Sequence, residues 1–305
     1  MALCGSQVMS AIKPTSAPAF SDSVAAPFSD VSRLSARTLG FYLALGVTLA
    51  FFALPIVWMA GIAFTPSGEY VSDNLSLLPA HPTLAHFEVL WRDGFPGRLG
   101  NTLIVAVGAT LLALSLGFLA SYALVRFRFP RRLDHAFLLL VLVIKMMPPI
   151  VVAIPLFQLL KGLGLLDSKL GLILVYQVYT LPFCIWMLLS FVRDVPLSLE
   201  EAASLEGAGL LRRLWHIVLP LCGPGLAATF IFTLIMAWNE FLFALLYLST
   251  PSHFTLPLYV SNFITENETF WGQLMGIGLL SSLPMLLMAG YVQRYLLRGF
   301  AMQMK

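Results

Sequence analysis

Two ionisable side chains, Glu240 and Lys145, lie inside long apolar stretches of the sequence and are the first candidates for chemistry. A charge at the centre of a bilayer costs about 2.5–3.5 kcal/mol on insertion scales, so such residues usually face a cavity or a partner group. Trp238 and Asn239 precede Glu240 directly. An aromatic ring can stack on the C–H face of a sugar, and amide or carboxylate groups can bind its hydroxyls. We expect at least one of these three residues to line a substrate pathway, the alternative being a hydrogen bond to a neighbouring helix.

Lys145 directly precedes Met146-Met147-Pro148-Pro149. Its ammonium group can pair with Glu240 or with an acid of a partner chain, extend to the bilayer interface, or contact an anionic substrate. The paired prolines predict a local break in the helix, which a membrane tolerates where the backbone lines a cavity or packs in protein. Lys145 and Glu240 could together also form the ion relay of a secondary transporter, and this is the alternative function.

No motif for bond-making chemistry occurs in the sequence. It contains neither the HExxH zinc motif, nor the GxSxG nucleophile elbow, nor the GxxxxGK[ST] phosphate-binding loop. The five histidines show no metal-ligand spacing, and the three cysteines are far apart. We therefore expect a chain that is not an enzyme and has no metal or cofactor of its own.

The composition is that of a polytopic membrane protein. Of the 305 residues, 59% are hydrophobic and only 11% are charged, against about 25% charged in an ordinary soluble domain. The mean hydropathy is +0.86. A net charge of +3 without a long basic run gives no basis for nucleic-acid binding. These values exclude a disordered protein and nearly every soluble enzyme.

Six stretches are long and apolar enough to cross a membrane as helices, which predicts an all-α fold. The expected spans are residues 39–64, 99–125, 136–160, 170–192, 217–248 and 269–293. Thirteen of the 18 Lys and Arg residues lie before the first span, after the second, after the fourth and after the sixth. Because cytoplasmic loops carry an excess of Lys and Arg, both termini are expected in the cytoplasm. Residues 1–38 predict a mobile N-terminal tail, residues 39–298 the membrane domain, and residues 299–305 a C-terminal tail.

The connection between the fourth and fifth spans carries helical signals of its own. It reads PLSLEEAASLEGAGLLRRLWHIVLPLCGP over residues 196–224. Ser198 followed by Glu201 fits a capping box, and Gly207 can end the helix. A short surface helix with small side chains, expected near 198–213, suits docking into a groove of a cytoplasmic partner.

The run Glu201-Ala202-Ala203, Gly207, Ile217 and Leu219-Pro220 resembles the EAA loop of binding-protein-dependent ABC importer permeases. Glu206 stands where many relatives carry Asp, which keeps the charge. The remainder is similar to the carbohydrate-uptake branch, in particular the smaller permease of maltose-type importers, and the resemblance covers roughly residues 39–298. The features that carry this similarity are Leu54-Pro55, Asn101-Thr102, Arg126-Phe127, Phe129-Pro130, Pro148, Pro155, Trp238-Asn239-Glu240-Phe241 and Gln293-Arg294.

The resemblance implies a six-helix permease of the type I fold in the inner membrane of a bacterium. Its implied partners are a second permease, favoured to be a different chain, two copies of a cytoplasmic ATPase that bind ATP and Mg, and a periplasmic solute-binding protein. The implied substrate is a sugar, sugar alcohol or glycoside. The EAA loop is implied to form the coupling helix, with Ser198, Glu201, Ala202, Ala203, Gly207, Arg212 and Arg213 as candidate coupling residues. One of the two arginines can be a plain cytoplasmic anchor.

The connection at residues 249–270 is longer than a simple turn and contains Tyr259, Asn262 and Phe263. The resemblance implies that it reaches toward the docked binding protein and helps to displace the sugar, the alternative being a cap over the pathway. An ion-coupled transporter would need no coupling helix. Replacing Ala203 with a bulky charged residue would therefore distinguish the two functions. An ion-coupled transporter should tolerate the change, whereas a coupling helix should release its ATPase.

Overall fold

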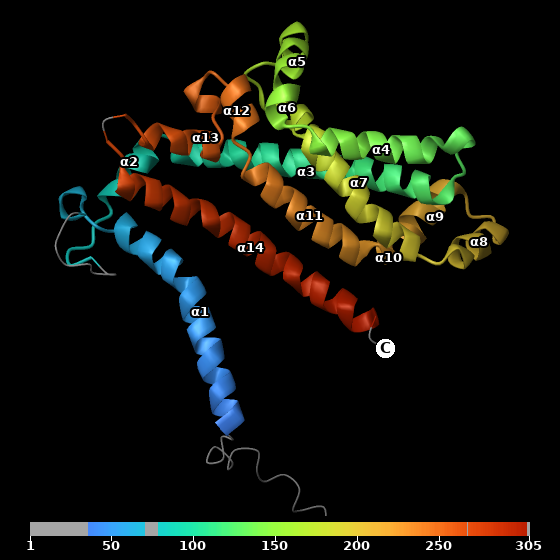
Figure 1. Ribbon diagram of the computed structural model, residues 1–305, viewed down its shortest axis with the longest axis horizontal. Helices are drawn as coiled ribbons and strands as arrows, with labels where there is room; N and C mark the ends of the chain where they lie inside the picture. The colour runs from blue at the N-terminus through green and yellow to red at the C-terminus, as the bar shows by residue number, and fades with distance from the viewer. Residues whose placement is uncertain (1–35, 71–78, 267, 304–305) are drawn as a thin grey trace, which may run out of the picture. The chain divides into compact units, whose positions relative to one another are not determined.

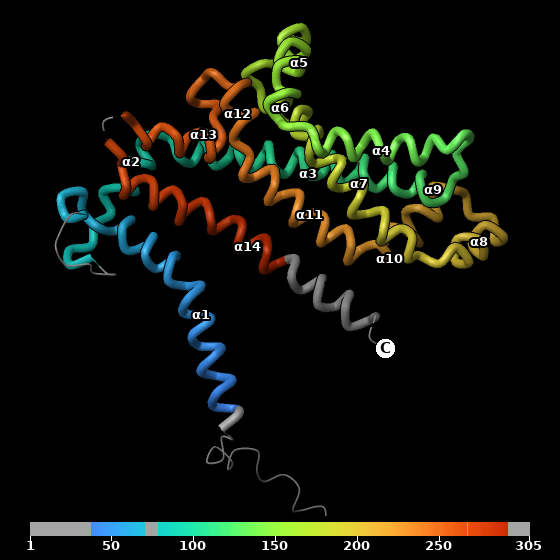
Figure 2. Tube along the Cα trace, viewed as in Figure 1, coloured from blue at the N-terminus to red at the C-terminus, as the bar shows by residue number. Residues whose placement is uncertain are grey.

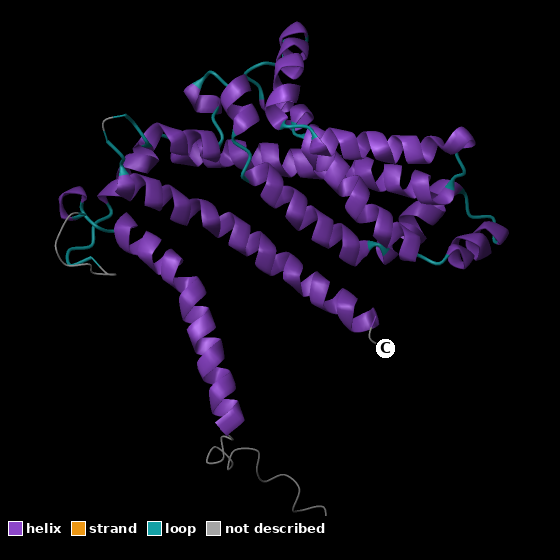
Figure 3. Cartoon of the chain, viewed as in Figure 1, coloured by secondary structure: helices purple, strands orange, loops and turns teal. Residues whose placement is uncertain are grey.

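The computed structural model describes residues 36–70, 79–266 and 268–303, and these are almost entirely helical (Figure 3). The only β-structure within those ranges is a single bridge between Ile264 and Thr269. The chain divides into two units, Met1–Leu54 and Pro55–Lys305. The expected all-α fold is confirmed. Residues 1–35, nearly all of the tail expected at 1–38, lie outside the described residues.

The helices follow one another along the chain, with a longer connection between α1 and α2 (Figures 1 and 2). They are α1 (Ala36–Ala63), α2 (Ala85–Arg92), α3 (Phe95–Arg126), α4 (Leu133–Met146), α5 (Pro149–Gly162), α6 (Lys169–Val175), α7 (Gln177–Asp194), α8 (Leu197–Leu205), α9 (Leu210–Arg213), α10 (Leu219–Leu221), α11 (Gly223–Trp238), α12 (Leu242–Tyr247), α13 (Leu256–Val260) and α14 (Trp271–Gln303). A π-helical segment, Leu214–Val218, joins α9 to α10. Within the second unit, α8 and α9 lie at one end of the bundle, and α2 and α13 lie toward the other (Figure 1).

Six membrane crossings are reached only when bent helix pairs are counted as single spans. Helices α1, α3 and α14 are long and apolar enough on their own. The bent pairs are α4 with α5 at 100°, α6 with α7 at 45°, and the segment Leu210–Leu221 with α11 at 74°. The break predicted at Met147-Pro148 is confirmed, because α4 ends at Met146 and α5 begins at Pro149.

One expected span boundary is wrong. Residues 217–248 do not form one span, since α11 ends at Trp238 and the separate helix α12 begins at Leu242. Helix α14 continues to Gln303 and so extends into residues 299–305, the segment expected as a C-terminal tail.

Helix α3 packs along α7 and α11 through a stripe of small side chains. Ala106, Ala109 and Ala113 are fully buried at helical spacing. A Cβ added to Gly117, farther along the stripe, would lie 2.7 Å from the Cβ of Cys184. Small residues let helix backbones approach closely in a membrane, where apolar side chains gain little from leaving lipid. The stripe therefore fixes α3 and α7 as the central pair of the bundle.

Candidate functional site

The segment expected as one coupling helix near 198–213 forms two short helices, α8 and α9. Gly207 separates them with a φ of +84°, in the left-handed region that glycine favours. The N–H of Gly207 donates to Ser204 O (3.0 Å), and the N–H of Ala208 donates to Ala203 O (2.9 Å). This pair of hydrogen bonds is a Schellman motif, which ends α8. The prediction that Gly207 can end the helix is confirmed.

The predicted capping box of Ser198 and Glu201 is wrong. Helix α8 begins one residue earlier, at Leu197, with Pro196 at the N-cap and no capping bond from a side chain there. The N–H of Leu199 donates instead to Pro196 O (3.2 Å). Glu201 is exposed, so its carboxylate is accessible to groups outside this helix.

One face of α8 is open to the surroundings. Ser198, Glu201, Ala202 and Leu205 follow helical spacing and are all exposed, and Leu205 has 91% of its surface exposed. Ala203 is half-buried on the face turned toward the rest of the chain. Helix α8 thus presents an outward face with a small residue at its centre and an apolar residue at its end, and only Glu200 and Ala203 of its residues are not exposed.

The inward face of α8 is held by Glu200, which is 2% exposed. Its Oε1 accepts a hydrogen bond from Arg126 Nε at 2.6 Å, and its Oε2 accepts one from the Tyr122 hydroxyl at 2.8 Å. Arg126 Nη2 also donates to Val195 O at 2.7 Å. The last turn of α3 therefore binds both α8 and the connection that precedes it.

The arginines Arg212 and Arg213 differ in environment. Arg212 is exposed, whereas Arg213 is half-buried. The Nε of Arg213 is enclosed and makes no hydrogen bond within the described part of the chain. Arg212 is consequently the more accessible of the two for a partner.

Glu240 lies between α11 and α12 and binds the start of α12. Its Oε1 accepts the N–H of Phe243 at 2.8 Å, and its Oε2 accepts the N–H of Ala244 at 3.2 Å. A carboxylate at a helix N-terminus satisfies free N–H groups and interacts favourably with the helix dipole. Glu240 thus has the hydrogen-bonded structural role that the sequence left as an alternative.

The other three candidate pathway residues lie in different environments. Trp238 is buried, with 5% of its surface exposed. Asn239 is exposed, and its Nδ2 donates to Ile235 O at 2.8 Å. Lys145 is exposed, with its Nζ 5.5 Å from the centre of the Phe183 ring. Asn239 and Lys145 are the two that remain open to a ligand.

A row of aromatic rings leads away from this region. Tyr176 and Tyr179 lie 5.7 Å apart between ring centres, Tyr179 stacks on Phe243 at 6.1 Å, and Phe243 stacks on Tyr247 at 5.8 Å. Phe157 continues the row, 6.1 Å from Tyr247. Helices α5, α7 and α12 contribute to the row, and Tyr176 lies at the junction of α6 and α7.

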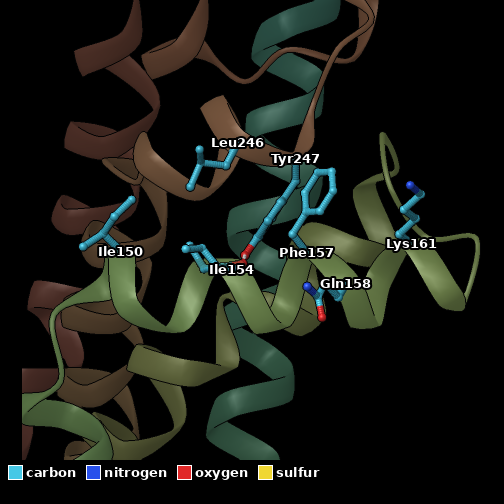
Figure 4. A pocket seen from close by; sticks show the side chains of 8 residues that line it. Ile150, Ile154, Phe157, Gln158, Lys161, Leu246 and Tyr247 are labelled. Atoms are coloured by element: carbon cyan, nitrogen blue, oxygen red, sulfur yellow. Dashed lines mark hydrogen bonds between the residues drawn. The ribbon is translucent and has the colours of Figure 1, made fainter.

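The row ends at a pocket of about 430 Å³ between α5 and α12. Its lining residues are Ile150, Ala153, Ile154, Phe157, Gln158, Lys161, Leu246 and Tyr247. Figure 4 shows Phe157 beside Tyr247, with Gln158 and Lys161 farther along α5. An aromatic face with an amide and an ammonium group offers stacking to C–H groups and hydrogen bonds to hydroxyls. Sequence patterns did not indicate this pocket, because its residues come from segments about 90 positions apart.

The 249–270 loop is built partly from core residues. Tyr259 is fully buried, and its hydroxyl donates to Asp93 Oδ2 at 2.6 Å. Burial and the hydrogen bond to Asp93 raise the pKa of Tyr259, so the hydroxyl remains a donor. The Arg98 guanidinium lies 4.2 Å from the centre of the Tyr259 ring. The expectation that Tyr259 itself reaches toward a partner is wrong in this arrangement.

The more accessible part of this loop follows Tyr259. Asn262 is exposed, and Phe263 is half-buried with its ring perpendicular to that of Tyr259, 5.0 Å between ring centres. Glu266 and Glu268 are also exposed. Any contact of the 249–270 loop with another protein would therefore begin at Asn262 and the acidic residues after it.

Two side chains fix the start of the loop. Asp167 Oδ1 accepts the N–H groups of Ser249 (3.0 Å) and Thr250 (3.1 Å), and its Oδ2 accepts the Thr250 hydroxyl (2.5 Å). Asn101 Nδ2 donates to the carbonyls of Ser252 (2.8 Å) and Phe254 (3.1 Å). The base of the loop is thereby anchored to α3 and to the connection before α6.

Burial by itself raises the pKa of Asp167, but hydrogen bonds from Thr250, Ser249 and His253 outweigh it and lower that pKa from 3.8 to about 2. A lowered folded-state pKa stabilises the fold above pH 3.8, and this stabilisation is lost as pH falls through 2. We expect Asp167→Asn to reduce the free energy of unfolding by about 1–2 kcal/mol at pH 7. The difference in melting temperature between wild type and variant should shrink between about pH 4 and pH 2. A difference that is constant with pH would contradict this role.

Comparisons with known protein families and known proteins identify the family of this chain. The family described as "Binding-protein-dependent transport system inner membrane component" matches residues 113–301. The diacetylchitobiose uptake system permease protein DasC of Streptomyces coelicolor is 34% identical over 246 residues, which are 80% of this chain and 88% of that protein. The trehalose/maltose transport system permease protein MalG of Thermococcus litoralis is 32% identical over 249 residues, with the same coverage, 80% and 88%.

A solved structure shows the same fold. It is the crystal structure of a bacterial ABC transporter involved in the import of the acidic polysaccharide alginate, with a TM-score of 0.70 and 22% identity. The match covers 88% of this chain and 99% of that one, which confirms the type I permease fold. Family match, relatives and fold together show that this chain belongs to the inner-membrane components of binding-protein-dependent transport systems.

Proposed function

We propose that this chain forms one half of the membrane pathway of an ATP-driven importer for a sugar, sugar alcohol or glycoside. The observation that carries the proposal is α8, an exposed helix with the EAA motif at the end of a bundle of membrane-spanning helices. The names of the relatives, which refer to diacetylchitobiose and trehalose/maltose transport, support the carbohydrate class.

The proposed complex contains four kinds of component. A second permease, different from this chain, completes the pathway, and two copies of an ATPase supply ATP and Mg²⁺ binding. A solute-binding protein delivers the sugar on the periplasmic side. Both termini of this chain lie in the cytoplasm, because the basic residues gather on that side.

In this mechanism the chain performs no bond chemistry. ATP binding brings the two ATPases together, and their motion displaces α8, which turns the pathway from inward-open to outward-open. Ser198, Glu201, Ala202, Leu205 and Arg212 are exposed, so they are the contacts with the ATPase. Ala203, Gly207 and Arg213 act by shaping the loop. The sugar shifts the equilibrium only through its different affinities for the two states.

The ion-coupled alternative lacks support. Glu240 Oε1 and Oε2 are occupied by the amides of Phe243 and Ala244. Lys145 lies beside Phe183 and forms no ion pair with Glu240 within the described residues. The relatives are permeases of binding-protein-dependent systems rather than ion-coupled carriers.

Affinity purification of this chain from its native membranes in mild detergent tests the proposal. Mass spectrometry should find an ATPase and a second permease bound to it, and any periplasmic protein present would lead to the ligand. A chain that purifies alone and transports solute in liposomes without ATP would overturn the assignment.

The α5–α12 pocket is proposed as a stretch of the sugar's path, together with Asn239 and Lys145. Phe157→Ala should lower uptake of the sugar about fivefold, because about 1 kcal/mol of ring contact is lost. Uptake into proteoliposomes at saturating binding protein measures this effect. Leu159→Ala is the control, since Leu159 is exposed on α5 but does not line the pocket. Equal losses in both variants would point to a general effect on α5.

A further inference from the structure

Helix α8 is joined to the neighbouring helices by non-helical backbone at both of its ends. Val195 and Pro196, which precede it, have extended backbone conformations, with ψ values of 118° and 126°. Gly207, which follows it, turns through a left-handed conformation without a side chain to restrict it. Because α8 is not continuous with α7 or α9, its position on the bundle depends on side-chain contacts.

Arg126 restrains both α8 and the connection before it. Its Nε binds Glu200 in α8 and its Nη2 binds the carbonyl of Val195 in the connection. The Tyr122 hydroxyl, one helical turn earlier in α3, binds the second oxygen of Glu200. The side chains of Arg126 and Glu200 are 10% and 2% exposed, so water does not compete for these contacts.

The end of α3 that carries Arg126 is itself fixed to α7. The Ser121 hydroxyl donates to Ile185 O at 3.0 Å in the buried interface. Farther along the same two helices, Gln177 Nε2 donates to Ala109 O at 3.1 Å. Helices α3 and α7 are thus tied by polar contacts at both ends of their small-residue interface.

We propose that the Arg126–Glu200 pair is the positioning link that makes α8 move as one body with α3 and α7. This inference rests on the proposed function and deepens it. Displacement of α8 by the ATPase then reaches the α3–α7 pair and, through Tyr179 of α7, which stacks on Phe243 of α12, the aromatic row. Arg126 and Glu200 act through α8 and do not touch the substrate.

A charged pair suits this role better than an apolar contact. Removing two charges from water offsets most of their attraction, so a buried ion pair contributes little net stability over apolar side chains of similar volume. Charge-assisted hydrogen bonds are short and directional, and the planar guanidinium can hold two acceptors in fixed positions. The pair therefore adds fixed geometry, which is what the transmission of a displacement requires.

The test compares sugar transported per ATP hydrolysed in the complete complex in proteoliposomes. Glu200→Gln keeps the shape of the side chain but leaves Arg126 buried without a counter-charge. The double variant Arg126→Met with Glu200→Met removes both charges and fills similar volume, so that the fold is kept. Arg128→Met is the matched control, because Arg128 is exposed two residues after Arg126.

We expect both test variants to retain bound ATPase and to hydrolyse ATP, while transport per ATP falls about tenfold. Arg128→Met should match the wild type. A double variant with the wild-type ratio would overturn the proposal, because the pair would then serve folding alone. A double variant that loses its ATPase would also overturn it, since the pair would then serve docking. Absence of ATP-dependent uptake in the wild-type complex would instead refute the proposed function.

Discussion

The variant Ala202→Arg is expected to purify without its ATPase and to lose ATP-dependent uptake almost completely. Ala202 lies at the centre of the exposed face of α8, between Glu201 and Leu205. If Ala202 packs into a groove of the ATPase, a long charged side chain at this position would either clash with the groove or bury an unpaired charge. The cost of about 3 kcal/mol or more for such a charge corresponds to about a 100-fold loss of affinity.

Ala202 is a sharper probe than Ala203, the position first suggested by the motif. Ala203 is half-buried, so a bulky residue there would disturb the packing of α8 on its own chain as well as any docking. Ala202→Ser is the control, since it adds a single oxygen atom and should keep the ATPase bound. Retention of the ATPase by Ala202→Arg, measured by co-purification and by uptake in proteoliposomes, would argue against α8 as the docking helix.

The membrane helices could be predicted from the sequence because lipid imposes a strong condition on composition. Every expected span overlaps an observed helix or bent pair, and the break before Pro149 was visible in the paired prolines. The end of α11 at Trp238 was not visible, because residues 217–248 remain apolar on both sides of it. That boundary depends on Glu240 capping α12, which only the folded structure places.

The motif in the sequence pointed to the candidate coupling loop, but its inward and outward faces could not be assigned. Glu200 and Glu201 are adjacent and identical in chemistry, so no local signal says which one is buried. The answer depends on Arg126 and Tyr122, which lie more than 70 positions earlier in the chain. Tyr259 was misassigned for a similar reason, because its partner Asp93 lies in a distant connection. Long-range polar contacts of this kind require the fold to be known.

Glu240→Leu is expected to lower ATP-dependent uptake about tenfold, whereas Glu240→Gln should retain much of it. Leucine leaves the N–H groups of Phe243 and Ala244 without their acceptor, and loss of such a cap costs about 0.5–2 kcal/mol. Helix α12 carries Phe243 and Tyr247 of the aromatic row, so their positions depend on this cap. The amide oxygen of glutamine can still accept one of the two bonds.

An ion relay would give a different pattern of uptake in the two Glu240 variants. A relay needs a carboxylate that gains and loses a proton, so glutamine should then abolish uptake as completely as leucine, and a protonophore should stop transport in the wild type. Uptake into proteoliposomes with ATP, with and without a protonophore, separates the two mechanisms. Glu88→Gln provides the matched control, because Glu88 is an exposed carboxylate on α2, outside the 249–270 loop and the α8 segment. Since the oxygens of Glu240 are bound to α12, we expect uptake to follow the integrity of this helix rather than the charge at position 240.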